Sequence, residues 1–242
     1  MHGSPRSGPP CIRLRNETVT DDLGLYARRA LAGVADADKA GPMAVYMKTT
    51  MPFYGVPSPL RRAIARSIYD RFPPADADQY RANVLALWNL DHREEKYLAL
   101  DFAIRFKRFV TLAQIELYER MITEGAWWDF VDAIASHLVG KVVGDDRLRM
   151  GSILKEWIDH DDLWLRRTAI LCQLRHKEET DEAMLFDFCL RRAHEKEFFI
   201  RKAIGWALRE YSKSEPEAVR EFLVANRGQL SSLTIREASK HL

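Results

Sequence analysis

The residues that point most directly to a chemistry lie on a helix predicted over residues 197–213. Lys202, Trp206, Arg209 and Lys213 are spaced i, i+4, i+7 and i+11, so one helical stripe carries all four. Cations in such a line can hold a phosphate backbone while the indole lies against a sugar or a base. The alternative is a solvated basic face with one stray tryptophan. The opposite face is predicted to pack on the core through Ile200, Ala203, Ile204, Ala207, Leu208 and Tyr211.

A second candidate site lies in the segment that begins Trp127-Trp128-Asp129. Trp128 and Asp132 are four residues apart and therefore share a face of a helix, beside an apolar stripe. A carboxylate next to an indole is an unusual environment for a helical aspartate, so the pair is a candidate for chemistry. The alternative is that Trp127 or Trp128 anchors the core and Asp132 lies at its edge, because helical aromatic residues usually face the core.

A third predicted helix places an arginine in an apolar stripe. Trp164 and Arg167 are three residues apart, and Leu171 follows four residues later on the same stripe. An arginine at such a position is costly unless it meets an anion. That anion is either a bound phosphate or an acidic side chain on an adjacent helix. The neighbouring Arg166 points elsewhere and is predicted to face solvent or phosphate.

Metal and nucleotide-cofactor sites have no support in the sequence. The seven histidines form no HxxxH or HExxH pair and there is no CxxC, although zinc sites need ligands at such spacings. GxGxxG, GxxxxGKS/T and GxSxG patterns are also absent. We therefore predict chemistry without a metal or cofactor, or no chemistry at all.

Composition places the chain among globular proteins. Its 242 residues are 47% hydrophobic and 30% charged, with a net charge of +2, so a polyanionic partner would require charges segregated onto faces. No apolar run approaches the ~20 residues of a membrane span, and residues 1–15 lack the hydrophobic stretch of a secretory signal. Three widely spaced cysteines suit a reducing compartment. We predict a cytoplasmic protein without membrane contact.

Helical periodicity extends over almost the whole chain, whereas strand-like alternation is nearly absent. Helices joined by short polar turns are typical of an all-α protein. The predicted helices span residues 21–35, 44–50, 60–72, 75–88, 91–109, 112–123, 127–139, 146–159, 162–177, 181–193, 197–213, 216–226 and 234–241.

Two segments of the chain repeat a pattern. Residues 162–170 and 197–204 both carry an acidic cap, aromatic and aliphatic residues, a basic pair, a small residue and an isoleucine, at an offset of 34 or 35 residues. Residues 94–100 are a weaker copy. Such a period predicts a right-handed α-solenoid of HEAT-like helical repeats with one concave face. We predict a flexible leader over residues 1–20 and a single domain over residues 21–242.

The same segments resemble the AlkD-type DNA alkylation repair glycosylases. The resemblance extends from about Ala40 to the C-terminus and involves several separate motifs in the same order. Those motifs are Tyr46-Met47-Lys48, Phe53-Tyr54-Gly55-Val56, Pro59-Leu60-Arg61-Arg62, Trp88-Asn89-Leu90 with Glu94, Trp127 to Asp132, Trp164 to Ile170, and Lys202 to Tyr211.

This resemblance implies a concave basic face that binds duplex DNA. It also implies that the protein excises N3- or N7-alkylated purines, such as 3-methyladenine and 7-methylguanine. It implies that Asp132 is the catalytic carboxylate and that Trp128 and Trp206 are walls against the deoxyribose of the lesion. It also implies that Arg167 clamps a phosphate and that Tyr46 belongs to the site. Arg166, Lys202, Arg209 and Lys213 are expected to add phosphate contacts. A monomer suffices for one lesion.

The implied chemistry suits a site with few groups. A purine alkylated at N3 or N7 is positively charged and leaves readily, so the developing charge is on the sugar, as in an oxocarbenium ion. An ionised Asp132 and two indole faces stabilise that charge, and the carboxylate can position water. Two alternatives have other functions: a non-catalytic binder of damaged or branched DNA, and a HEAT-type scaffold for protein interactions.

Overall fold

A computed structural model describes residues 19–242, and within them every regular element is helical. The predicted leader, residues 1–20, lies outside the described residues except for its last two, which open the first helix. None of the described helices is long and apolar enough to pass through a membrane. The α-helices are α1 (Val19–Ala32), α2 (Ala37–Met47), α3 (Ser58–Arg71), α4 (Ala77–Trp88), α5 (Arg93–Arg105), α6 (Ile115–Gly125), α7 (Trp128–Ala133), α8 (Gly140–Asp145), α9 (Arg147–Asp159), α10 (Leu163–Leu171), α11 (Glu182–Arg191), α12 (Phe198–Tyr211), α13 (Pro216–Ala225) and α14 (Ser232–Ala238).

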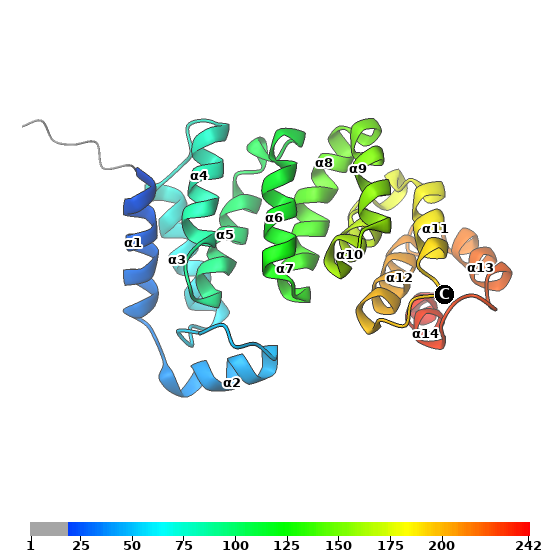
Figure 1. The fold of residues 1–242 in the computed structure, drawn as a ribbon, viewed down its shortest axis with the longest axis horizontal. Helices are drawn as coiled ribbons and strands as arrows, with labels where there is room; N and C mark the ends of the chain where they lie inside the picture. Colours follow the sequence, from blue (N-terminus) through cyan, green and yellow to red (C-terminus); the bar gives the residue numbers. More distant parts are fainter. Residues whose placement is uncertain (1–18) are drawn as a thin grey trace, which may run out of the picture.

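The helices stand side by side in a row along the long axis of the molecule, from α1 at one end to α13 and α14 at the other (Figure 1). Helix α2 lies across the end of this row, below α1 and α3. One set of helices forms a chain of neighbours: α3 packs on α5, α5 on α7, α7 on α10, α10 on α12 and α12 on α14. We call these six helices the repeat series.

The repeat series has a regular period in the sequence. Its helices begin at residues 58, 93, 128, 163, 198 and 232, so the interval is 35 residues four times and then 34. The two segments in which the sequence showed a repeat are the beginnings of α10 and α12. The structure extends this period to α3, α5, α7 and α14. Residues separated by 35 positions therefore occupy equivalent places on adjacent helices.

Local sequence explains where many of these helices begin. Aspartate and serine side chains accept hydrogen bonds from the free backbone N–H groups of a first helical turn, which stabilises the helix start. Asp36, Asp76, Asp146, Asp162 and Asp181 do so for α2, α4, α9, α10 and α11, and Ser231 does so for α14. All six residues of the predicted apolar face of α12 are buried.

The structure corrects the predicted bounds most at three places. The helix predicted over 44–50 is α2, which begins earlier because Asp36 caps it and ends at Met47 because Lys48 is left-handed, with φ 50°. The helix predicted over 127–139 continues through a π-helical segment, η3 (Ile134–Val139), into α8 and ends at Asp145. The helix predicted over 162–177 ends at Leu171, and the residues after it form a loop in which His176 contacts Gly140.

Close contact between α12 and α14 requires a glycine at Gly205. A Cβ atom there would lie 2.5 Å from Cβ of Glu237 and 2.9 Å from the carbonyl oxygen of Thr234. These distances are far below van der Waals contact, so the two helices approach this closely only because residue 205 has no side chain. The contact also places α14 against the basic stripe of α12.

Gly205→Ala is therefore expected to lower the free energy of unfolding by about 1–3 kcal/mol, the usual cost of overpacking. Gly151→Ala is the matched control, since Gly151 lies within α9 with nothing within 4 Å of the added Cβ. There the better helix propensity of alanine is expected to raise stability by up to about 1 kcal/mol. Urea unfolding measures both, and equal effects of the two variants would contradict the close α12–α14 contact.

Candidate functional site

Four charged residues occupy one position of the repeat. Asp132, Arg167, Lys202 and Glu237 lie on α7, α10, α12 and α14, each 35 residues after the one before. They form two ion pairs between adjacent helices, Asp132 with Arg167 and Lys202 with Glu237. The predicted carboxylate and two predicted DNA-binding cations are thus brought into one row by the helical repeat.

The ion pair between Asp132 and Arg167 is bidentate. Nε of Arg167 donates to Oδ1 of Asp132 at 2.8 Å and Nη2 donates to Oδ2 at 2.9 Å, while Nη1 donates to the carbonyl oxygen of Phe199. Arg167 is only 3% exposed. The anion that the sequence required for this arginine is therefore, in this structure, an acid on an adjacent helix, and that acid is Asp132. The phosphate clamp stays a prediction.

Burial and pairing act in opposite directions on Asp132. Removal from water raises the pKa of Asp132 above its ordinary value, and the hydrogen bonds and charge of Arg167 oppose this rise. The nearby charge of Asp129 adds to the increase in the pKa of Asp132. The side chain of Asp132 is 16% exposed, so it is not fully sealed from solvent while the arginine fixes its orientation.

The second carboxylate of α7 is held from the other side. Nη2 of Arg93 donates to Oδ1 of Asp129 at 2.6 Å, and the hydroxyl of Tyr97 donates to Oδ2 of Asp129. Arg93 also lies over the ring of Phe130, with 4.3 Å from Cζ to the ring centroid. These partners come from α5, so α7 is tied by ion pairs to both neighbours in the repeat series. Neither Arg93 nor Tyr97 was predicted from the sequence, although Tyr97 lies 35 residues before Asp132.

Asp132 and Trp206 line a common cleft of about 390 Å³. Two of the three predicted catalytic residues are therefore brought together, from helices two steps apart in the repeat series. Trp128 is not part of its lining and lies at the start of α7, 37% exposed. The full lining consists of Asp132, Ala133, Ser136, His137, Leu174, Arg175, Trp206 and Glu210.

The two adjacent tryptophans have different environments. Trp127 packs against Trp164 and Phe199, with ring centroids 5.9 and 5.4 Å away. The core-anchor interpretation thus applies to Trp127, and Trp128 is the indole left accessible. The aromatic cluster lies beside Arg167, whose Cζ is 5.8 Å from the centroid of the Phe199 ring.

The π-helical segment η3 begins two residues after Asp132 and contributes residues to the lining of the cleft. In α-helical geometry a residue five positions after Asp132 would lie roughly 140° around the helix axis, whereas the wider i→i+5 turn of a π-helix brings it back toward the same face. His137 is this residue, and it lines the cleft with Asp132. Burial, and then the positive charge of Arg175, lower the pKa of His137. Neither His137 nor Arg175 was predicted from the sequence as a site residue.

The basic stripe of α12 is largely neutralised by acids. Glu237 of α14 accepts ion pairs at 2.8 Å from Lys202, Arg209 and Lys240. The pKa of Glu237 is lowered to about 2, mainly by hydrogen bonds from Lys202 and Lys240. Three cations around one carboxylate leave a net positive charge at this position.

The last cation of the stripe, Lys213, lies apart from these. Its ammonium pairs with Glu210 at 2.8 Å, three residues earlier on the same helix. Glu210 also lines the cleft of Asp132. The predicted stripe is therefore divided into a cluster around Glu237 and a separate pair beside the cleft.

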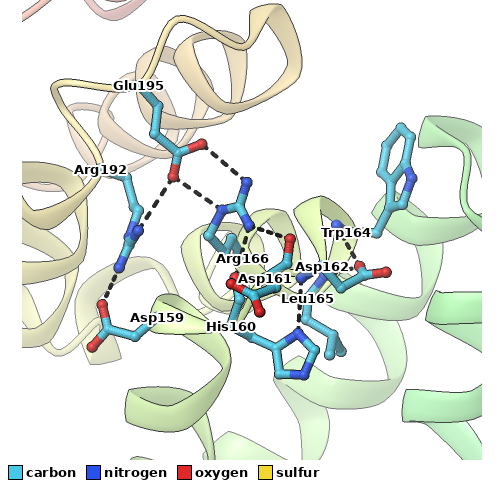
Figure 2. A network of polar contacts seen from close by, with 9 residues as sticks. All are labelled: Asp159, His160, Asp161, Asp162, Trp164, Leu165, Arg166, Arg192 and Glu195. Atoms are coloured by element: carbon cyan, nitrogen blue, oxygen red, sulfur yellow. Dashed lines mark hydrogen bonds and ion pairs between the residues drawn. The ribbon is translucent and has the colours of Figure 1, made fainter.

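Arg166 takes part in a network on another side of α10. Its Nη1 donates to the carbonyl oxygens of His160 and Asp161 at 2.7 Å, and its Nε lies 3.0 Å from Oε1 of Glu195. Figure 2 shows Arg166 directed toward Glu195 and Arg192, away from Trp164. The guanidinium thus joins the start of α10 to the loop before α12, and its expected phosphate contact stays a prediction.

Tyr46 lies near the end of α2 and does not line the cleft of Asp132. It projects from α2 and is 77% exposed.

The buried carboxylate of Glu94 accepts backbone N–H bonds from Tyr54, Gly55 and Val56 at 2.9 to 3.1 Å. The backbone N–H of Asp36, the cap of α2, donates to the carbonyl oxygen of Tyr54 at 2.9 Å. Glu94 therefore holds the loop on which the start of α2 rests.

Among residues 19–242, no three or more His, Cys, Asp or Glu side chains gather as metal ligands would. In the same part of the chain, Cys172 and Cys189 are free and buried.

Comparisons with known proteins give a consistent result. A family model described as "DNA alkylation repair enzyme" matches residues 27–242. The solved structure of a "Predicted DNA alkylation repair enzyme from Enterococcus faecalis" is 31% identical to this chain, with a TM-score of 0.79, and the match covers 86% of this chain and 96% of that one. The structure of smu.31 from Streptococcus mutans is 14% identical with a TM-score of 0.60, covers 91% and 99%, and is similar in fold. No curated protein matches the chain.

The cluster around Glu237 gives a pH-dependent prediction. The folded-state pKa of about 2 lies below the ordinary 4.5, so ionised Glu237 contributes stability above that ordinary value and the contribution is lost as the pH falls toward the folded value. We expect Glu237→Gln to be less stable than the parent at pH 7. The difference should shrink between pH 4.5 and about 2. Urea unfolding across this range measures it, and a pH-independent difference would contradict the ion pairs.

Proposed function

This chain belongs to the DNA alkylation repair enzyme family, and on that premise we propose that it is an alkylpurine DNA glycosylase. Its substrate is duplex DNA that carries N3- or N7-alkylated purines, among them 3-methyladenine, 7-methylguanine and bulkier N-alkyl adducts. The observation that carries the proposal is that Asp132, a carboxylate held by an arginine, lines the same cleft as the indole of Trp206.

The proposed architecture is a right-handed solenoid of HEAT-like repeats whose concave face binds DNA. The 35-residue period and the side-by-side order of the repeat series support it. The candidate residues also support a common face, since Asp132, Arg167 and Trp206 all lie on this series while the helices between them lie outside it. A surface that continues across several repeats suits a long partner such as a DNA duplex.

The proposed reaction is hydrolysis of the N-glycosidic bond. The bond between C1′ and the purine nitrogen breaks, and its electron pair leaves with the alkylated base, which loses its positive charge. Positive charge then develops on the sugar, where the carboxylate of Asp132 and the indole faces of Trp128 and Trp206 stabilise it. Water adds its oxygen to C1′, and its proton passes to Asp132 and then to solvent. The products are free base and an abasic site.

Arg167 supports this reaction through Asp132. Buried carboxylates tend to be protonated, which would abolish the electrostatic stabilisation of a cation. The bidentate contact opposes that effect and fixes the orientation of the carboxylate. Two of its three guanidinium nitrogens donate to Asp132 and the third donates to Phe199, so we propose a positioning role beside the phosphate clamp that the family resemblance implies.

The remaining parts of the proposal concern cofactors, oligomeric state and cellular location. The site is proposed to act without metal or cofactor, because departure of a cationic purine needs no strong acid and charge stabilisation requires only Asp132 and the indoles. The protein is proposed to act as a monomer in the cytoplasm, on nucleoid DNA.

The primary test is base release from a duplex with a single 7-methylguanine. We expect Asp132→Asn to lower the rate by at least about a hundredfold, the usual effect of removing one preorganised electrostatic group, with nearly unchanged affinity for the duplex. Asp187→Asn, at an exposed position of α11, is the matched control and should retain activity. Equal rates for parent and Asp132→Asn would discard Asp132 as the catalytic carboxylate. DNA binding without release by the parent would favour a non-catalytic binder, and no binding would favour a scaffold.

The pH dependence of base release tests the role of Arg167. Activity needs ionised Asp132, so the rate falls as the pH drops through the pKa of Asp132. Arg167→Gln removes the contacts that lower this pKa, and the acidic limb of the rate profile should therefore move to higher pH. A variant that only bound DNA more weakly would change KM and leave the acidic limb of kcat in place, which would contradict the positioning role.

A further inference from the structure

The predicted DNA-binding cations are largely occupied within the protein. Arg166, Lys202, Arg209 and Lys213 have carboxylate partners, and Arg167 is paired with Asp132. A phosphate would have to compete with these partners. Cations that border the site and lack such partners are better placed to bind an anion.

Arg175 and Lys177 are two such cations. Both side chains are exposed, and neither makes an ion pair or a side-chain hydrogen bond with another of the described residues. Both lie in the loop between α10 and α11, residues 172–181, although the sequence predicted a helix up to residue 177. In a continuous helix they would follow the direction of α10, whereas the loop places Arg175 at the border of the cleft and Lys177 in a cavity next to it.

The loop 172–181 is held by contacts along its length. Nε2 of His176, the residue between the two cations, lies 2.9 Å from the carbonyl oxygen of Gly140. The side-chain amide of Gln173 exchanges two hydrogen bonds with the backbone of Asp181, at 2.8 and 3.1 Å. Nη2 of Arg147 donates to the carbonyl oxygen of Glu179 at 2.6 Å. The backbone that carries Arg175 and Lys177 is therefore fixed before any partner binds.

Arg175 lies between two cavities. It lines the cleft of about 390 Å³ that contains Asp132, and also a neighbouring cavity of about 460 Å³ between the loop and α12. The second cavity holds Lys177 and Lys213 among its lining residues, with Glu178 and Glu210 as its acids. Glu210 is paired with Lys213. Burial, and then the charge of Arg175, lower the pKa of His137, which lines the same cleft.

We propose that the loop 172–181 is a phosphate-binding loop, in which Arg175 and Lys177 hold the phosphodiester backbone of the DNA strand beside the lesion. The inference rests on the proposed function, since it takes the lesion to lie in the cleft of Asp132. The planar guanidinium of Arg175 suits bidentate contact with a phosphate, and Lys177 adds a point charge on the neighbouring cavity. This contact fixes the strand while Asp132 and Trp206 act on the sugar.

The test is the salt dependence of binding to an undamaged duplex. The slope of log K against log salt is negative, and each lost phosphate contact reduces its magnitude by about 0.9 for B-form DNA. Arg175→Ala/Lys177→Ala should therefore reduce the magnitude of the slope by about 1.8. The control is Lys155→Ala/Arg227→Ala, which removes the same charge at two exposed positions outside both cavities. Its slope should stay within half a unit of the parent. Unchanged melting temperatures establish that all variants are folded.

The outcomes separate this inference from the proposed function. A smaller slope for the loop variant than for the control supports the phosphate-binding loop, and equal slopes overturn it. Base release by the parent is measured in parallel on the 7-methylguanine duplex: a parent that binds DNA but releases no base contradicts the glycosylase, while the slopes still decide the loop. A parent that fails to bind the duplex overturns both.

Discussion

A carboxylate that is mostly removed from water needs a partner, and the ion pair between Asp132 and Arg167 meets this requirement across two helices of the repeat series. Unpaired, the buried carboxylate would take up a proton more readily and lose its value for stabilising a cation. The arginine could not be buried either, because its guanidinium needs acceptors in the interior. Each side chain of the pair thus allows the other to be buried in its charged form. The equivalence of positions 132 and 167 in the 35-residue period places the two side chains within reach.

The same requirement explains the charge distribution around the site. Arg93 is paired with Asp129, and Lys202 with Glu237, so the charges that the repeat series carries inward are mostly balanced. Such pairs hold neighbouring helices in register. Because their cations already have carboxylate partners, few of them are free to bind a polyanion. The net charge of +2 for the whole chain agrees with this balance. In the proposed phosphate-binding loop, affinity for DNA comes from Arg175 and Lys177, which have no such partners among the described residues.

The helices were largely predictable because their apolar residues recur at the helical period and their starts carry capping side chains. The misplaced bounds have causes that a local pattern does not contain. Residues 172–177 have no strong helix breaker, yet α10 ends at Leu171 and His176 contacts Gly140 some 36 residues earlier. The π-helical turn after Asp132 is likewise not visible in the periodicity. In both cases a contact or a hydrogen-bonding pattern beyond the local sequence decides the backbone path, and each affects a residue of the cleft.

The sequence by itself determined the all-α class, the period of the repeat, and the family to which the motifs around Asp132, Arg167 and Trp206 belong. These properties depend on residue types at fixed spacings along one helix or one repeat. The tertiary structure decided which charges are neutralised, that Asp132 and Trp206 share a cleft, and that Arg175 joins them while Trp128 does not line it. Those outcomes depend on the register of one helix against the next, and that register is set by close packing such as the contact at Gly205. A spacing within one helix says which side chains share a face, but only the packing between helices says what that face meets.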